Sequence, residues 1–333
     1  MVTKGFHVLE PGLQTSFQDW PGRLGHWRTG VPPSGPMDSL SFRLANLLLG
    51  NEPGTPALEI QLLGPKLEAL VDVDIAIAGG EAHALVDNQT IPSNRSLRMR
   101  RGARLTFGGL RKGARSYLAV AGGFDRPQVL GSASTFVRGG IGGGALVKDE
   151  TLLLASPRIC TEHKALAPEA TPEIGSPAVI HVTAGAHFDW LDAPGREALL
   201  EGPWKVSPRS DRTGIRLSGP EITYARRALE KSPEHGSVPT NVINTGYSIG
   251  GVNICGGTPI ILPFDGPSQG GFITPIVVAS GAMWRLGQLR PHDTLTFLRI
   301  RLDEAVALRR DLEQMISNPQ FRPVDLLVAG AQP

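Results

Sequence analysis

Residues 71–78 read VDVDIAIA, and apolar and polar side chains alternate along the first half of this stretch. The valines and isoleucines at odd positions fall on one side, whereas Asp72 and Asp74 fall on the other. A two-residue period is the period of a β-strand. The stretch therefore predicts a half-buried strand with one face in a hydrophobic core.

Similar short apolar runs recur along the whole chain. The sequence contains 41 glycines and 28 prolines, and most of the runs are separated by Gly/Pro turns. This punctuation is typical of β-barrels or sandwiches rather than of βαβ units. The sequence therefore predicts a mainly β protein with few helices. The further predicted strands are 103–108, 116–121, 178–184, 259–264 and 294–300.

Helices are expected at only a few places. The clearest covers 38–49, where Asp38 is a good N-cap and Gly50 suits a left-handed C-terminal position. A second helix is expected over 302–316, from apolar residues at helical spacing. Two shorter ones are predicted at 195–202 and 223–231.

The chain divides into two predicted halves. Residues 156–177 are rich in Pro, Ala and Glu without a clear period, which indicates a linker or crossing segment. The N-terminal β domain would then cover 1–155, including the capped helix, and the C-terminal domain 178–333, ending in a helix.

Composition excludes several classes of function. The formal net charge of +2 gives no basic surface for nucleic acid, and no apolar run reaches the length of a membrane span. Cys160 and Cys255 cannot build a disulfide framework, and no spacing indicates a metal site. We expect a small-molecule substrate and a cytoplasmic location.

Two glycine-rich loops admit a functional and a structural interpretation. GVPPSGPMD (30–38) offers the backbone N–H groups of Ser34 and Gly35 to an anion, or it is a rigid connection into the helix at Asp38. The sequence favours the rigid connection. RGGIGGGALVK (138–148) lacks the GK[ST] ending of a P-loop, which favours a flexible loop.

The segment 244–272 concentrates polar side chains and glycines around two turns. Such loops bind ligands at strand ends, or they are hairpin turns with satisfied side chains, and the pattern leaves both open. Cys255 has no neighbouring base, which favours a buried thiol over a nucleophile. The polar residues are Asn244, Tyr247, Ser248, Asn253, Asp265 and Ser268.

The stretch SPRSDRTGIRLSGP (207–220) places Asp211 between Arg209 and Arg212. Either the three charges form a surface ion-pair network that contributes little to stability, or Asp211 is an acceptor for a planar cationic N–H donor. The pattern alone leaves this undecided.

Four long motifs in fixed order resemble the allophanate hydrolase subunit 2 type of domain, a half of the carboxyltransferase in biotin-dependent urea carboxylase. The similarity runs from about residue 6 to 300. The sequences GVPPSGPMD and DGPSQGGF are more similar to the urea carboxylase branch than to the branch that contains the C-type subunit of 5-oxoprolinase. The motifs are PGLQTSFQDWPGRLGHWRTGVPPSGPMDSLSFRLANLLLGN, SDRTGIRLSGP, GYSIGGVNICGGTPIILPFDGPSQGGFITP and WRLGQLRPHDTLTF.

The resemblance implies two β-barrel-like domains related to the cyclophilin-like fold, and several partners. They are a subunit 1-type protein or domain, a biotin carboxylase that uses ATP, and a biotin carrier. The string GAMWRL (281–286) has no lysine where a biotinylation motif would carry one. Biotin would therefore be carried on a partner.

The resemblance also implies a reaction and its site. Carboxybiotin releases CO2, the resulting enolate takes a proton from a substrate nitrogen, and that nitrogen attacks CO2. Asp211 and Arg212 would be catalytic, and Arg209, Tyr247 and Asn253 would bind substrate with Asp211. The loops of the transfer site would contribute Ser34, Gly35, Asp265, Gly266, Ser268 and Gly270.

Asp211 is also a departure from the urea-type pattern, which usually reads SNRTG. Asparagine offers neutral urea a donor and an acceptor, whereas ionised aspartate offers acceptors only, which suits a guanidinium cation. The hypothesis is that Asp211 selects a guanidine-like substrate.

Other departures indicate a different substrate or a paralogue without this turnover. The family's FTGD is here Ile254-Cys255-Gly256-Gly257, Asn244 replaces a common Asp, and Ser248 replaces Ala. Two alternatives stay open. One is a component like the C-type subunit of 5-oxoprolinase, an ATP-dependent amide hydrolase, and the other is a non-catalytic module that binds and regulates a partner.

Overall fold

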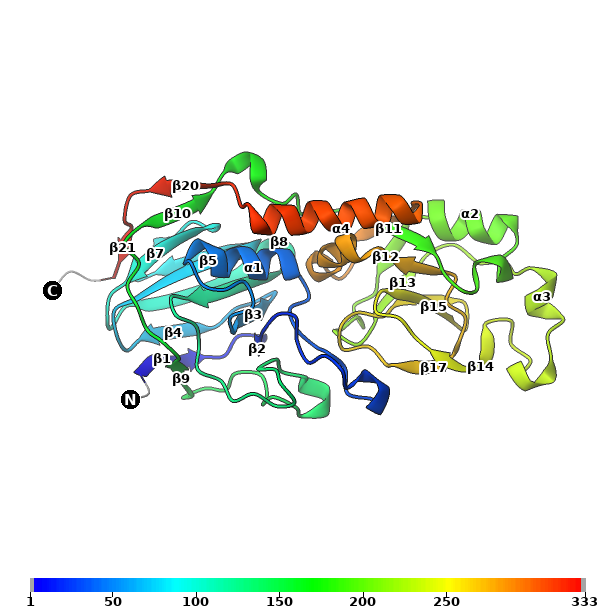
Figure 1. The fold of residues 1–333 in the computed structure, drawn as a ribbon, viewed down its shortest axis with the longest axis horizontal. Helices are drawn as coiled ribbons and strands as arrows, with labels where there is room; N and C mark the ends of the chain where they lie inside the picture. Colours follow the sequence, from blue (N-terminus) through cyan, green and yellow to red (C-terminus); the bar gives the residue numbers. More distant parts are fainter. Residues whose placement is uncertain (1–2, 331–333) are drawn as a thin grey trace. The chain divides into compact units, whose positions relative to one another are not determined.

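The computed structural model describes residues 3–330, which form two compact units (Figure 1). Of the described residues, unit 1 comprises 3–24, 34–174 and 314–330, and unit 2 comprises Gly25–Pro33 and Gly175–Glu313. The predicted mainly β architecture with few helices is confirmed. No helix in the described part is long and apolar enough to cross a membrane.

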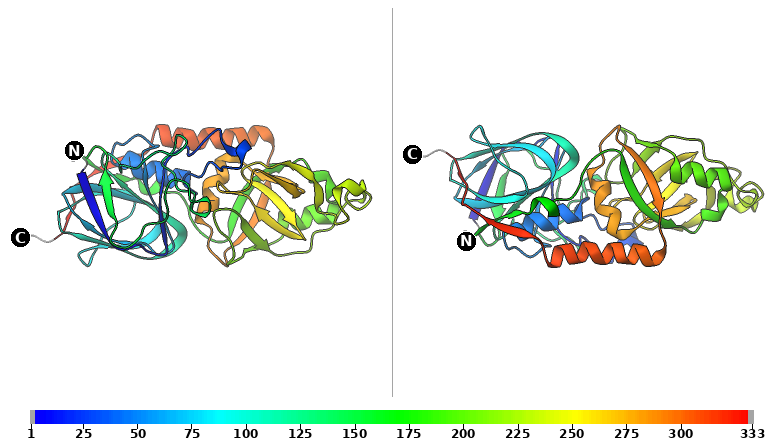
Figure 2. Two further views of the ribbon diagram at one scale, coloured as in Figure 1. Left: turned by 90° about the horizontal axis from the view of Figure 1, so that it is seen from below. Right: turned by 90° about the horizontal axis from the view of Figure 1, so that it is seen from above.

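Unit 2 contains a closed barrel of seven strands, visible from two sides in Figure 2. The parallel pairing of β11 with β19 closes it, and alternate residues such as Ile180 and Val182 are fully buried. A separate two-stranded ribbon joins β14 (Asn241–Gly246) to β17 (Gln269–Phe272). In order round the barrel the strands are β11 (Ala178–Ala184), β18 (Ile276–Val278), β15 (Gly251–Cys255), β16 (Thr258–Ile261), β13 (Ile215–Ser218), β12 (Trp204–Val206) and β19 (Thr294–Arg299).

Unit 1 is built on a twelve-stranded sheet, whose main path runs β20-β10-β7-β5-β8-β4-β1-β9. The predicted strands 103–108 and 116–121 are parts of one long strand, β8. The strands are β1 (Thr3–Glu10), β2 (Gln14–Gln18), β3 (Ala57–Gln61), β4 (Lys66–Ala69), β5 (Val73–Val86), β6 (Gln89–Thr90), β7 (Arg95–Met99), β8 (Arg104–Val120), β9 (Thr151–Leu154), β10 (His163–Leu166), β20 (Phe321–Val324) and β21 (Val328–Ala329).

Residues 73–78 of the VDVDIAIA stretch form the first part of β5, and this part is buried on both faces. Ile75 and Ile77 face the main core, as predicted. Ala76 packs with residues of α1 (Ser39–Leu48), and Asp74 is fully buried in an ion pair with Arg98, Nε to Oδ1 2.8 Å. The half-buried prediction is therefore wrong, because a helix from a distant part of the chain covers the second face.

The capped helix is confirmed as α1. The Asp38 side chain accepts from the backbone N–H of Ser41 at 2.9 Å and from its hydroxyl at 2.6 Å, and Gly50 has φ +65°. The 302–316 prediction is confirmed by α4 (Leu302–Ser317). The shorter helices are α2 (Ala193–Glu201) and α3 (Arg226–Leu229), and the 3-10 turns are η1 (Trp27–Thr29), η2 (Val137–Gly139), η3 (Pro168–Ala170), η4 (Phe188–Trp190), η5 (Pro233–His235) and η6 (Ser280–Gln288).

The segment predicted as a linker carries a strand of the unit 1 sheet. β10 lies between β7 and β20, which brings the green and red strands of Figure 1 side by side. The chain after α4 therefore adds β20 and β21 to unit 1, so the helix is not its last element. Residues 25–33, from the N-terminal part of the sequence, belong to unit 2. Pairing between distant strands decides these boundaries.

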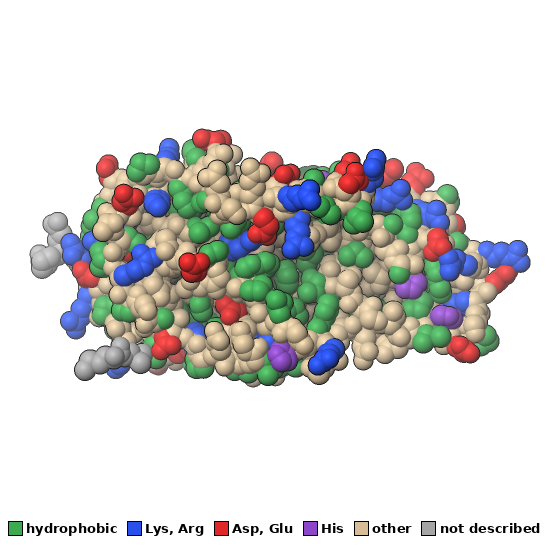
Figure 3. All heavy atoms as spheres, in the orientation of Figure 1, with side chains coloured by type: hydrophobic (Ala, Val, Ile, Leu, Met, Phe, Trp, Pro, Cys, Tyr) green, Lys and Arg blue, Asp and Glu red, His purple; other side chains and the backbone are tan. Residues whose placement is uncertain are grey.

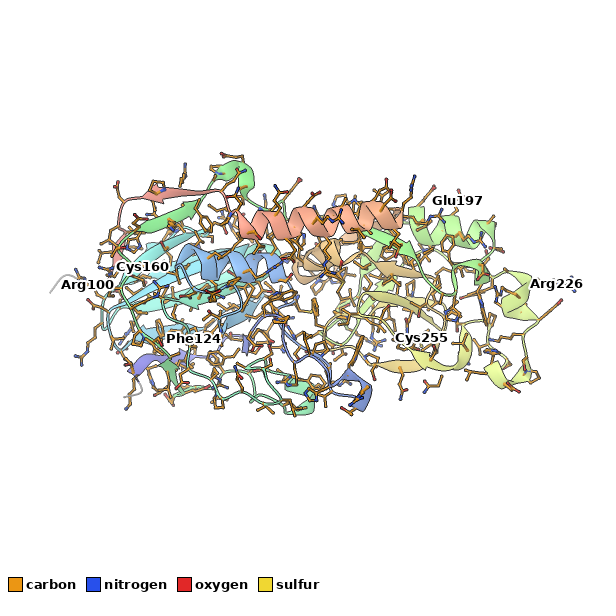
Figure 4. All side chains as sticks on the ribbon, in the orientation of Figure 1. Arg100, Phe124, Cys160, Glu197, Arg226 and Cys255 are labelled. Atoms are coloured by element: carbon orange, nitrogen blue, oxygen red, sulfur yellow. The ribbon has the colours of Figure 1, made fainter. Side chains whose placement is uncertain are left out.

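The two cysteines are free and lie in different units (Figure 4). Burial raises the pKa of the half-buried Cys160 thiol, which lowers its reactivity. On the face shown in Figure 3, acidic and basic side chains are interspersed, in keeping with the small net charge.

Removal of the α1 cap is expected to destabilise the protein. Asp38→Ala leaves the Ser41 N–H without this buried acceptor, and we expect a loss of about 1–2 kcal/mol in the free energy of unfolding. Urea denaturation measures it. Asp311→Ala on the exposed side of α4 is the matched control, and an equal loss in both variants would contradict a specific role of the cap.

Stability is expected to fall on acidification. Burial lowers the pKa of His163 and of His181 below the ordinary value of 6.5. The unfolded chain therefore binds more protons than the folded chain below about pH 6.5, so the free energy of unfolding decreases as the pH falls from there. Urea titrations at several pH values measure the slope, which His163→Gln should reduce and exposed His83→Gln should not.

Candidate functional site

Asp211 organises a tight turn in unit 2. Its Oδ1 accepts from the Thr213 N–H at 2.8 Å, the Thr213 hydroxyl at 2.6 Å and the Gly214 N–H at 3.1 Å. Its own N–H donates to the Gly214 carbonyl at 3.2 Å. The residue is exposed. One oxygen of this carboxylate therefore has a clear structural task, which the sequence pattern did not show.

Arg212 points to a different carboxylate, that of Asp265. The Arg212 Nε lies 2.7 Å from Oδ2 and its Nη2 lies 3.3 Å from Oδ1, a two-pronged ion pair. Both residues are only 5% exposed. The Asp265 N–H also donates to the Arg212 carbonyl at 3.2 Å. A buried charge requires its partner, so this pair joins the Asp211 turn to the DGPSQGG loop.

The guanidinium of Arg209 is exposed and has no hydrogen-bond or ion-pair partner in the described part of the chain. Only the Arg209 N–H is engaged, donating to the Ser207 hydroxyl at 3.2 Å. Two residues from Asp211, the site therefore presents a cation to solvent. Its charge and planar donor set suit a carboxylate.

The DGPSQGG loop is held near its first end by two hydrogen bonds at Gly266. The Gly266 N–H donates to the Pro263 carbonyl at 3.0 Å, and the Trp27 indole N–H donates to the Gly266 carbonyl at 3.4 Å. Trp27 belongs to unit 2 although it lies far away in sequence. Sequence reasoning missed it, because nothing in its local pattern relates it to residue 266.

Tyr247 holds the other end of this loop. Its N–H donates to the Ser268 carbonyl at 2.9 Å, and its hydroxyl oxygen accepts from the Phe272 N–H at 2.8 Å. A Cβ at Gly270 would come within 2.6 Å of that hydroxyl, so glycine is required there. Burial raises the pKa of Tyr247, which keeps the phenol protonated at neutral pH.

Asn253 is buried and contacts a residue that the sequence did not single out. Its Oδ1 accepts from the Thr274 hydroxyl at 2.9 Å. The Thr274 N–H in turn donates to His187 Nδ1 at 3.1 Å. The structure thus joins Asn253 to Thr274 and His187, whereas Tyr247 makes its hydrogen bonds to Ser268 and Phe272.

Ser34 and Gly35 lie in unit 1, on a buried loop. The Gly35 N–H donates to Gln18 Oε1 at 3.1 Å, and the next N–H groups along the loop also have acceptors within unit 1. This supports the rigid connection into α1 and not an anion cradle. Ser34 is fully buried at φ +56°, and its hydroxyl has no hydrogen-bond partner among the residues described.

The departures at 254–257 form a hairpin turn. Cys255 pairs with Thr258 across Gly256 and Gly257, whose φ values are +55° and +83°. A two-residue turn with positive φ at both positions favours glycine. Ile254 before it is fully buried in the barrel. The lost acid and aromatic residues are therefore replaced by residues that suit the tight turn and the core.

No group of three or more metal-ligating side chains occurs among residues 3–330. What the site offers is instead a set of fixed polar groups on two loops and a strand of unit 2. A family model for the carboxyltransferase domain, subdomain A and B, matches residues 29–299. The chain belongs to this family. The resemblance seen in the sequence is confirmed.

Three relatives show the range of this carboxyltransferase family. The chain is 39% identical over 325 residues to the urea amidolyase of Saccharomyces cerevisiae, covering 93% of the chain and 17% of that protein. It is 31% identical over 319 residues to the C-type subunit of 5-oxoprolinase from Escherichia coli, covering 95% and 97%. The Kluyveromyces lactis urea carboxylase structure aligns with a TM-score of 0.88 at 39% identity, over 95% of this chain and 29% of that one. The chain thus spans less than a third of the urea-type proteins.

Removal of one partner from the buried ion pair is expected to be costly. Asp265→Ala leaves the Arg212 charge without this carboxylate, and we expect a loss of about 3–5 kcal/mol in the free energy of unfolding. Glu230→Ala, which breaks the exposed Arg226–Glu230 pair, is the control and should cost about 0.5 kcal/mol or less. Chemical denaturation measures both, and similar losses would show that the buried pair has no special weight.

Proposed function

We propose that this chain is the carboxyltransferase component of a biotin-dependent carboxylase, and that it acts on a guanidine-like or urea-like nitrogen. The observation that carries the choice of substrate is the turn at Asp211, with its Oδ1 engaged by three donors from Thr213 and Gly214. The family membership and the urea-type relatives support the reaction class.

The geometry of the turn explains why aspartate and asparagine exchange here at little structural cost. An asparagine amide oxygen accepts the same three hydrogen bonds, so the turn forms with either residue. The difference falls on the second side-chain atom, an anionic oxygen in aspartate and an N–H donor in asparagine. A cationic planar substrate with donors only therefore prefers Asp211, whereas neutral urea also finds a donor in asparagine.

The contacts of the residues near Asp211 suggest a role for each of them in the proposed reaction. Arg212 would act as a fixed cation, since Asp265 holds its guanidinium, and it positions the Asp211 turn beside the substrate. Tyr247 and Asn253 would bind the substrate as neutral hydrogen-bonding groups. Gly266, Ser268 and Gly270 would shape the transfer site through their backbone.

The exposed Arg209 fits the carboxylate of carboxybiotin in charge and donor geometry. When bound, that group supplies the carboxyl to be transferred. The task of this chain's residues is to orient the substrate nitrogen and to hold charge in place by preorganised donors.

We infer the partners of this chain from the domains of the urea-type relatives that it does not match. It matches 17% of the urea amidolyase, so the remaining activities would come from other domains or proteins. They would be a subunit 1-type protein, an ATP-using biotin carboxylase and a biotin carrier, acting in the cytoplasm.

A second candidate is a component like the C-type subunit of 5-oxoprolinase, an ATP-dependent amide hydrolase. It is favoured by the match over 97% of the Escherichia coli relative, a protein of similar length. Turnover of 5-oxoproline without a biotin carrier would identify it.

The substrate preference is tested in a complex reconstituted with the three partners, by ATP consumption with guanidine, methylated guanidines, urea and 5-oxoproline. We expect guanidine to be preferred, and Asp211→Asn to shift the ratio of kcat/KM toward urea by about ten-fold, or about 1.4 kcal/mol. Asp293→Asn is the control, because this carboxylate also caps a turn, accepting from the Arg290 N–H at 2.8 Å.

An unchanged ratio in Asp211→Asn would refute the role of Asp211 and leave the reaction class intact. Turnover of none of the substrates, with the complex formed, would favour a regulatory module that binds its partner without catalysis.

A further inference from the structure

His187 and Thr274 are joined by two hydrogen bonds in opposite directions. The backbone N–H of Thr274 donates to the ring nitrogen His187 Nδ1 at 3.1 Å, and the backbone N–H of His187 donates to the Thr274 carbonyl at 3.3 Å. An imidazole nitrogen that accepts a hydrogen bond carries no proton, so the ring is the neutral tautomer protonated at Nε2.

From Thr274 the hydrogen bonds continue into the candidate site. The Thr274 hydroxyl donates to Asn253 Oδ1 at 2.9 Å. Thr274 and Asn253 are 8% and 3% exposed. Water therefore has little access to replace a broken hydrogen bond. The loss of the hydrogen bond at His187 is expected to change the position of the Asn253 side chain.

The ring of His187 packs against Trp190. It meets the Trp190 ring edge to face, with centroids 5.3 Å apart at 85°. The Trp190 ring also lies 5.8 Å from the His235 ring, centroid to centroid, and 5.5 and 5.8 Å from the cations of Arg227 and Lys231. The imidazole therefore packs against an aromatic ring that also contacts two cations.

We propose that neutral His187 positions Asn253 through Thr274, and that protonation of His187 releases it. The inference rests on the proposed function only in so far as Asn253 binds the substrate. His187 itself contacts no reacting atom in this scheme and is a positioning residue.

The chemistry of the ring explains the release. A protonated imidazole has two donors and no acceptor, so the Thr274 N–H loses its partner and faces another N–H. Burial lowers the pKa of His187, assisted by Arg227 and His235 and opposed by Asp189. The row of hydrogen bonds is therefore intact at neutral pH and opens only at a pH below the ordinary value of 6.5.

Two variants separate the role of His187 as a hydrogen-bond acceptor from the effect of its protonation. His187→Asn places an amide oxygen near the position of Nδ1 but does not titrate, whereas His187→Ala removes the acceptor. His292→Asn is the control, since His292 is exposed at φ +74°, a conformation that asparagine tolerates.

The first readout uses the chain alone. The amide signal of Thr274 is followed by NMR against pH, together with its hydrogen exchange. We expect one acid transition in the wild type and in His292→Asn, none in His187→Asn, and fast exchange of the Thr274 amide at every pH in His187→Ala. A pH-independent wild type, or slow exchange in His187→Ala, would overturn the proposal.

The second readout is turnover in the reconstituted complex. We expect kcat/KM of the wild type to fall on the acid side, His187→Asn to lose that fall, and His187→Ala to be slower at all pH values by roughly ten- to a hundred-fold. An equal fall of kcat/KM at acid pH in the wild type and in His187→Asn would also overturn the proposal. If no substrate turns over while the NMR transitions appear as expected, the proposed function fails and the positioning role stands.

Discussion

The site in unit 2 depends on the ion pair between Arg212 and Asp265. Removing both charges from water is expensive, and the cost is recovered only while the two side chains face each other. The pair therefore fixes the Asp211 turn to the DGPSQGG loop, whose other end is held by Tyr247. The two loops are thereby joined into one surface, and in the proposed function this preorganised surface orients the substrate.

The structural role of Asp211 in the turn is compatible with the chemical role that the proposed function gives it. One carboxylate oxygen closes the turn, so a polar side chain with an acceptor is needed at this position for folding alone. The choice between aspartate and asparagine is then left to function. The hairpin at Gly256 and Gly257 shows the reverse case, where a departure from the family pattern is explained by positive φ without any change in chemistry.

Unit 1 shows how a loop that is rich in glycine and proline becomes rigid. The N–H groups from Gly35 to Asp38 are satisfied by Gln18, Glu59 and Tyr117, all of them buried. A loop whose donors are used inside the protein cannot present them to an anion. The strained, buried Ser34 sits within this fixed frame, with its hydroxyl lacking a partner among the residues described.

The sequence by itself determined the mainly β class, the strands with clear alternation, the Asp38 cap and the family. These features follow from local periodicity, local capping and motifs that are contiguous in the chain. Only the tertiary structure decided that residues 73–78 of β5 are buried on both faces, that the segment around β10 joins a sheet with β20, and that Arg212 pairs with Asp265. The same holds for His187, whose partner Thr274 lies 87 positions away. Contacts between residues this far apart depend on how strands pair and pack, and no pattern of neighbouring residues encodes them.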